Sequence, residues 1–208
     1  MQNIKFVILC LSILLITNLN AQQVSISPTK VWSNNYELNN PVGISISIYQ
    51  PIWKLGLKAE FLYASNEREY FGYPVYGYFA DSPEFGPENV RSNSVLQSYE
   101  FSVWIPSIVN ISDLAALNVG VGLSVDRFSA EREGLSSGEL VNITSDSKFG
   151  FLYAISIETG NFFSLPIKLG IAYKHKSLMS STYVTDTEQP FVDAVDLKEL
   201  QFSVGYQF

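Results

Sequence analysis

The chain has 208 residues, of which 47% are hydrophobic and 14% are aromatic, so it is too apolar for a disordered protein. Its length corresponds to one domain, or at most two. The 20 acidic residues outnumber the 13 basic ones, which leaves little positive charge to neutralise phosphate and argues against a nucleic-acid partner. With one histidine and one cysteine in the whole chain, a histidine-rich metal site and an intrachain disulfide are excluded.

The first 21 residues have the layout of a secretory signal peptide. Lys5 precedes an apolar run over residues 6–16, and a small residue ends the segment. Cys10 lies inside the run behind a bulky leucine, whereas the lipidated cysteine of a lipoprotein follows a small residue at the end of the run. We therefore expect residues 1–21 to be a cleaved signal peptide and residues 22–208 to be the mature domain.

Beyond this segment, apolar residues recur with a period of two, which predicts half-buried β-strands. The alternation is clear in seven segments, 42–49, 55–63, 98–105, 117–126, 149–158, 167–174 and 199–208. A weaker eighth strand is predicted at Gln22 to Trp32, where Pro28 interrupts the pattern and belongs at a strand edge or bulge. After residue 21 no apolar stretch reaches the about 18 to 20 residues that a membrane-spanning helix requires.

Alternation alone leaves open a soluble sandwich, a lipocalin-like barrel and an outer-membrane barrel. The second face of the strands is rich in Gly, Ser and Ala with isolated charges, which suits a narrow lumen. Short connections at 50–53, 106–114 and 159–164 alternate with long ones at 66–94, 128–146 and 177–196. This favours a barrel with short periplasmic turns, long external loops and both ends in the periplasm.

The chain resembles the small outer-membrane β-barrel family of the OmpX and OmpA type. The resemblance rests on the signal segment, the alternating strands over most of residues 22–208, and the closing segment 200–208. The terminal Phe208, with aromatic or apolar residues at every second position before it, is similar to the signal that directs such chains to membrane assembly. The resemblance implies an all-β, eight-stranded antiparallel transmembrane β-barrel in the bacterial outer membrane. Its expected partners are lipid, lipopolysaccharide and the assembly machinery, and it implies no cofactor and no activity.

Charged residues on the predicted lumen face form one group. They are Lys58, Glu60, Glu100, Asp126, Glu158, Lys168, Lys174 and Glu199. Buried charges are costly unless they are paired, so we expect a hydrogen-bonded network that plugs the barrel. The alternative is a proton or ion path, but eight strands enclose an interior just wide enough for side chains to fill.

The predicted external loops carry far more acidic than basic residues. This indicates an anion-repelling outer face, or carboxylates that bind divalent cations and so link the loops to lipopolysaccharide or a partner. No segment has the spacing of a calcium loop, so no metal ligand is expected. The longest loop contains six aromatic residues, Tyr70, Phe71, Tyr73, Tyr76, Tyr78 and Phe79. These rings either cap the barrel mouth or present themselves to an extracellular ligand or protein.

His175, Lys176 and Ser177 form the remaining candidate for chemistry. Strand parity places His175 and Ser177 on the lipid-facing side near the external rim, and Asp196 has the same outward parity. The element resembles the His-x-Ser motif of outer-membrane lipid A deacylases, which implies a histidine-activated serine oriented by an acid. Leu178 stands where that family has asparagine, and its acid is normally glutamate. We therefore expect a non-catalytic surface protein, structural or ligand-binding through its acidic and Tyr-rich loops, with a lipid A hydrolase as the alternative.

Overall fold

The computed structural model describes most of the predicted barrel. The described ranges are 23–34, 40–72, 87–112, 115–138, 140–144, 147–160, 165–178, 182–183, 190–192 and 195–208. Within these ranges, no helix is long and apolar enough to cross a membrane. The predicted signal peptide, residues 1–21, lies outside them and stays a prediction.

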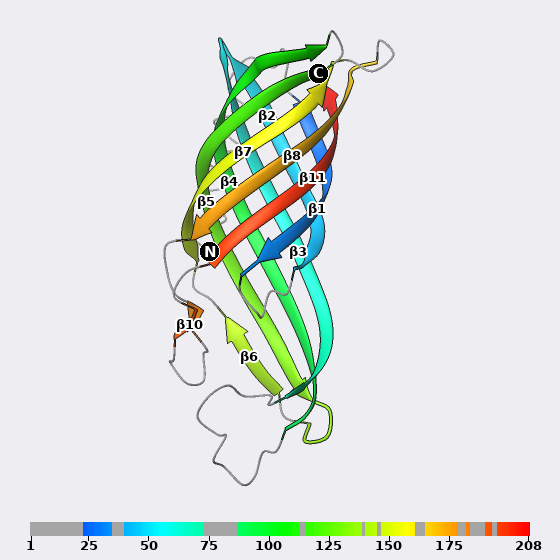
Figure 1. Ribbon diagram of the computed structural model, residues 1–208, viewed down its shortest axis with the longest axis vertical. Coiled ribbons are helices and arrows are strands. Elements are labelled where there is room, and N and C mark those ends of the chain that lie inside the picture. The colour runs from blue at the N-terminus through cyan, green and yellow to red at the C-terminus, as the bar shows by residue number, and fades with distance from the viewer. Residues whose placement is uncertain are drawn as a thin grey trace.

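The described strands form a closed antiparallel ring (Figure 1). The ring contains β1 (Gln23–Ser33), β2 (Val42–Ile52), β3 (Leu55–Gly72), β4 (Glu88–Ser112), β5 (Ala115–Gly134), β7 (Lys148–Thr159), β8 (Ile167–Leu178) and β11 (Val195–Gln207). Each strand pairs with the next one in this series, and β11 pairs with β1 to close the ring. A short strand, β6 (Leu140–Thr144), adds to β5, while β9 (Thr182–Tyr183) and β10 (Pro190–Val192) form a separate pair. The predicted eight-stranded architecture is confirmed.

The weak first strand is present despite its proline. Pro28 faces outward and stays opposite Ile44 of β2, whereas the register between β1 and β11 skips Ser27 and Pro28. Proline has no N–H to donate, so one interrupted ladder is the expected consequence. Gln23 lies opposite Gln207, which brings the two ends of the ring to the same side.

Three neighbouring strands are much longer than the membrane requires. β3, β4 and β5 have 18, 25 and 20 residues, whereas a membrane-spanning strand needs about 9 to 11. Their outer parts and β6 form a sheet that projects from one end of the ring (Figure 1). We call this the external sheet; it comprises residues 66–72, 88–94, 129–134 and 140–144. The prediction of loops over 66–94 and 128–146 is therefore wrong for these residues, because polar side chains on both faces hide the period of two.

The outer wall of the ring is apolar. Ile44, Val121 and Phe151 are 58%, 61% and 57% exposed, and the other outward residues of the ring are mostly Ile, Leu, Val and Phe. An apolar belt of this size would promote aggregation in water, but it matches the hydrocarbon of a bilayer. At the end with short turns, Tyr206 and Phe208 pack edge to face with ring centroids 5.0 Å apart, as aromatic girdles do.

Candidate functional site

Inward-facing charges meet in one buried cluster inside the ring. The Lys174 ammonium lies 2.6 Å from carboxylate oxygens of both Glu60 and Glu100. The Lys176 ammonium lies 2.9 Å from Glu100, 3.1 Å from Asp126, and also pairs with Glu199. Both lysine side chains are almost fully buried. We call the group the lumen network; it comprises Lys58, Glu60, Glu100, Asp126, Lys174, Lys176 and Glu199.

Neutral side chains complete this network. The Gln201 amide donates a 2.5 Å hydrogen bond to Glu60, and Lys176 donates a 2.8 Å hydrogen bond to the Ser98 hydroxyl. Lys58 reaches the second oxygen of Glu60 at 2.8 Å. The contributing strands, β3, β4, β5, β8 and β11, include pairs that are not neighbours in the ring. Because buried charges require partners, the network links opposite walls of the barrel.

The carboxylates of the network are close enough to resemble a metal site. Oxygens of Glu60, Glu100 and Glu199 lie within 4.8 Å of one another. However, each of these carboxylates is paired with Lys174, Lys176 or both. The two ammonium groups therefore supply the positive charge that a cation would bring.

Most of the residues expected in the lumen are brought together. Lys58, Glu60, Glu100, Asp126 and Lys174 all belong to the network. Lys168 does not; it lines a cavity nearer the short-turn end together with Glu158. The sequence interpretation missed Lys176, although strand parity puts it on the same face as Lys174 and could have identified it.

An apolar layer crosses the lumen on the external side of the network. Leu62 follows Glu60 along β3, and Leu197 precedes Glu199 along β11; both side chains are completely buried. The other members of the cluster are Val31, Ala64, Leu96, Phe128, Ala130, Val141, Leu178 and Val195. The lumen is thus closed by a charged layer and an apolar layer, of which only the charged one was predicted.

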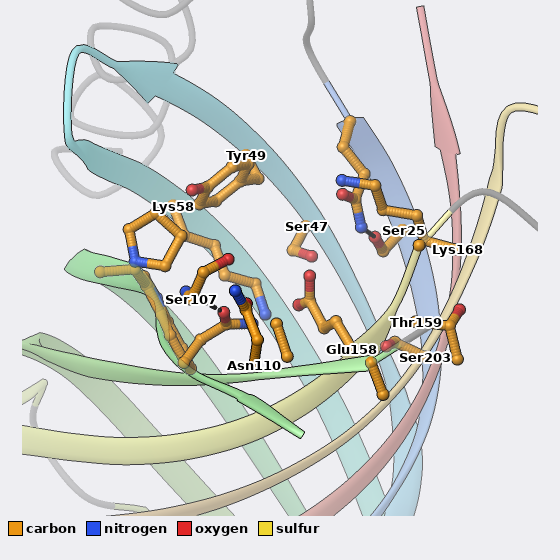
Figure 2. A pocket seen from close by; sticks show the side chains of 17 residues that line it. Ser25, Ser47, Tyr49, Lys58, Ser107, Asn110, Glu158, Thr159, Lys168 and Ser203 are labelled. Atoms are coloured by element: carbon orange, nitrogen blue, oxygen red, sulfur yellow. Dashed lines mark hydrogen bonds between the residues drawn. The ribbon is translucent and has the colours of Figure 1, made fainter. Parts of the chain in front are cut away.

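At the short-turn end the lumen opens into a polar cavity of about 340 Å³ (Figure 2). Its lining comes from every strand of the ring, and hydroxyl and amide side chains predominate. Lys58 connects the two regions, because its ammonium pairs with Glu60 and its side chain also lines the cavity. We call this space the periplasmic cavity.

The candidate catalytic residues meet on the outer surface near the opposite rim. Nε2 of His175 lies 3.7 Å from Oδ1 of Asp196, and Ser177 is opposite Asp196 in the β8–β11 register. Nδ1 of His175 bonds instead to the hydroxyl of Tyr153, and Nε2 has no hydrogen-bond partner among the described residues. The three residues share one patch, but it lacks the hydrogen bond through which a histidine activates a serine.

The outward face of the external sheet is dominated by carboxylates. Arg91 lies 3.0 Å from Glu69, 3.6 Å from Glu67 and 3.7 Å from Glu133, and all four side chains are substantially exposed. Glu131 adds a further negative charge on β5. One guanidinium shared by several carboxylates leaves this face acidic.

The Tyr-rich segment begins on the external sheet. The Tyr70 ring packs against Arg68, with the guanidinium carbon 4.7 Å from the ring centroid. Phe71 points to the other face and is 70% exposed. The remaining members of the predicted aromatic cluster, Tyr73, Tyr76, Tyr78 and Phe79, lie outside the described residues.

Glu88 holds the turn that follows β5 at the tip of the external sheet. Its carboxylate accepts hydrogen bonds from the backbone N–H groups of Ser136 and Ser137, at 2.6 and 2.9 Å, and from the Ser137 hydroxyl at 2.5 Å. These bonds favour the ionised carboxylate and lower the pKa of Glu88, with the Ser137 hydroxyl as the main cause. The start of β4 is thereby tied to the turn after β5.

Comparisons with known proteins identify the fold. No protein-family profile and no curated protein sequence matches the chain. Neisserial surface protein A is 17% identical, with 90% of this chain and 96% of that chain covered and a TM-score of 0.53. A major outer membrane protein from Thermus thermophilus is 9% identical, with 91% and 100% covered and a TM-score of 0.59. The outer membrane protein OprG from Pseudomonas aeruginosa is 9% identical, with 91% and 96% covered and a TM-score of 0.47.

The first two neighbours show that this chain has the fold of the small outer-membrane β-barrels. This confirms the resemblance that the sequence indicated. The apolar belt around the ring is the surface that such a fold buries in lipid. The protein therefore has the architecture of an integral outer-membrane barrel.

Proposed function

We propose that the protein is a non-catalytic surface receptor, exported by the signal peptide at residues 1–21, whose external sheet binds a basic, extended segment of an extracellular partner. The observation that carries this proposal is the projection of β3, β4, β5 and β6 beyond the apolar belt. Strands of this length are not needed to span a membrane. The extra residues have a role outside it.

The edge of β3 that faces away from β4 supports binding by strand addition. Pairing between β2 and β3 ends at Val42 opposite Ser65, and no strand among the described residues pairs with that edge of β3 over residues 66–72. An extended peptide can add to such a strand edge as a further strand of the sheet.

Charge defines which partner fits this edge. Glu67 and Glu69 lie on β3 itself and face outward beside Arg91. A second copy of the same edge would bring carboxylates against carboxylates, so self-association is disfavoured, whereas a basic segment is attracted. The exposed ring of Phe71 offers an apolar anchor at the end of the same strand.

The rest of the molecule supports a role without catalysis or transport. The two layers across the lumen leave the ionic groups paired with one another rather than available to a substrate. At the rim, His175 bonds to Tyr153 and not to Ser177. The cation-bridged attachment to lipopolysaccharide has no comparable geometric support, because Arg91 already occupies the middle of the acidic face.

Binding of designed peptides to the protein in lipid nanodiscs tests this proposal. The probe is an extended peptide of alternating Lys and Val, and its Glu and Val counterpart is the negative control. We expect the basic peptide alone to bind, to protect the amides of residues 66–72 from deuterium exchange, and to lose affinity at 1 M salt, where the Debye length is about 3 Å.

Matched substitutions locate the contact. The double change Glu67→Gln and Glu69→Gln should weaken binding by about two- to thirtyfold, the range of two exposed charge pairs. Glu131→Gln is the control, because Glu131 is on the same sheet but on β5, which is paired with strands on both sides. Equal binding of both peptides, or equal loss in the control variant, would refute binding at the β3 edge.

A further inference from the structure

The periplasmic cavity is shaped by glycines that make room for aromatic rings. A Cβ on Gly56 would overlap the Tyr49 ring, and one on Gly120 would lie 2.6 Å from the Trp104 ring. Both approaches are far closer than van der Waals contact, so only glycine leaves room for these rings beside the neighbouring strand. Tyr49 and Trp104 both line the cavity.

A bulge in β4 directs further polar groups toward the same space. The register between β4 and β5 shifts between Ile105 and Val109. Within this bulge Ser107 has a positive φ of 54°, and its N–H donates a 2.8 Å hydrogen bond to the Asn118 side chain. Bulges re-aim side chains, and a non-glycine residue with positive φ persists only where the surroundings hold it. Ser107 and Asn118 both line the cavity, and Figure 2 shows Ser107 there.

Two opposite charges in the cavity are left without a partner among the described residues. Glu158 and Lys168 line it from β7 and β8, and in the part of the chain that the structure describes neither makes an ion pair or side-chain hydrogen bond. Lys58 also points into the space, but its ammonium is engaged with Glu60 at 2.8 Å. The cavity therefore offers one available cation and one available anion that are not paired with each other.

We propose that the periplasmic cavity is a binding site for a small zwitterion of amino-acid to dipeptide size. The ligand carboxylate pairs with Lys168 and its ammonium group with Glu158. A simple anion bound to Lys168 would be repelled by the Glu158 carboxylate, and a simple cation bound to Glu158 would leave the charge of Lys168 uncompensated. A ligand that carries both charges therefore fits best. The volume of about 340 Å³ falls in the range of small-molecule sites. The hydroxyl, amide and aromatic groups around the cavity suit the polar backbone and small side chains of such a ligand.

Fluorescence of Trp104 provides the readout. The chain has three tryptophans, so the double variant Trp32→Phe and Trp53→Phe leaves Trp104 as the single reporter. The folded barrel in detergent micelles is titrated with alanyl-alanine, its N-acetylated form, its C-terminal amide, and the form blocked at both ends. We expect saturable binding of the free dipeptide and at least about tenfold weaker binding of each singly blocked form, as for loss of one charge-assisted hydrogen bond.

Two variants separate recognition from an effect on folding. Lys168→Gln should weaken binding of the free dipeptide by about tenfold without changing the affinity for the C-terminal amide. Glu158→Gln should do the same without changing the affinity for the N-acetylated form. Lys54→Gln, in the exposed turn at the same end of the barrel, is the control, and heat-modifiable migration on a gel verifies folding in each case.

No saturable change in Trp104 emission with the free dipeptide would overturn the proposal. Equal affinity for all four probes would also overturn the proposal, because binding would then not depend on the two charged ends of the dipeptide. The same holds if folded Lys168→Gln and Glu158→Gln proteins bind the free dipeptide as the parent does.

Discussion

The lumen network yields a quantitative prediction for Lys176→Met. The Lys176 ammonium is completely buried and contacts Glu100, Asp126 and Glu199. Methionine keeps a similar length but removes the charge, so three carboxylates lose a shared cation inside the barrel. Removing one partner of a buried ion pair costs about 3 to 5 kcal/mol. We expect the free energy of unfolding to fall by that amount while the strand pairing stays intact.

Urea unfolding of the barrel in lipid vesicles, followed by tryptophan emission and by heat-modifiable gel migration, measures this change. Adding Glu199→Gln to Lys176→Met should restore part of the stability, because one uncompensated carboxylate is then neutral. Residues in direct contact show coupling energies of about 0.5 to 3 kcal/mol. Lys198→Met is the matched control: Lys198 is exposed on the outer side of β11, and such surface changes stay within about 0.5 kcal/mol.

Unfolding of Lys176→Met at the same urea concentration as the Lys198→Met control would show that the buried ammonium does not stabilise the barrel. Additive effects of Lys176→Met and Glu199→Gln on the free energy of unfolding would show that the two residues are independent and do not link the walls of the barrel.

Three further predictions concern other parts of the molecule. Gly120→Ala should lower stability by about 1 to 3 kcal/mol in the same urea assay, because the added methyl overlaps Trp104. The pKa of Glu88 is lowered in the folded protein, so its bonds stabilise the turn at pH values above the ordinary pKa of 4.5 and are lost as the pH falls through the folded pKa. The protection of the amides of residues 135–138 from exchange, relative to their intrinsic rates, should therefore fall below pH 4.5 and stay constant above it. Ser177→Ala should leave the mass spectrum of cellular lipid A unchanged, and a Ser177-dependent loss of an acyl chain would instead establish the hydrolase alternative.

Strand parity explains why the wall of the barrel could be predicted from the sequence. Along β2, Val42, Ile44 and Ile46 alternate with small polar residues, and the structure places the apolar set outside. The bilayer requires every ring strand to obey the same rule, so one period of two defines both faces. The lumen positions of Glu60 and Lys174 follow from the same parity.

Contacts across the lumen could not be predicted in the same way. Lys174 and Glu60 are 114 positions apart and belong to strands that are not neighbours. Their meeting depends on ring closure and on the stagger of the strands, neither of which alternation specifies. The apolar layer was missed for another reason. Phe128 is the first residue of the predicted loop 128–146, and Leu96 lies just after the predicted loop 66–94, although both side chains point inward and are buried.

The two layers across the lumen separate the two proposed binding regions. The lumen network and the apolar cluster lie between the external sheet and the periplasmic cavity, and both are buried and internally paired or packed. Two sites influence each other through an element that has two alternative arrangements, and the closed antiparallel ring around both layers shows a single arrangement. Affinity for the dipeptide should therefore be the same with and without the basic peptide bound, and the purified protein should show no large, stable conductance in a planar bilayer. A change in dipeptide affinity on peptide binding, or steady conductance, would mean that the layers rearrange and that the barrel connects its two ends.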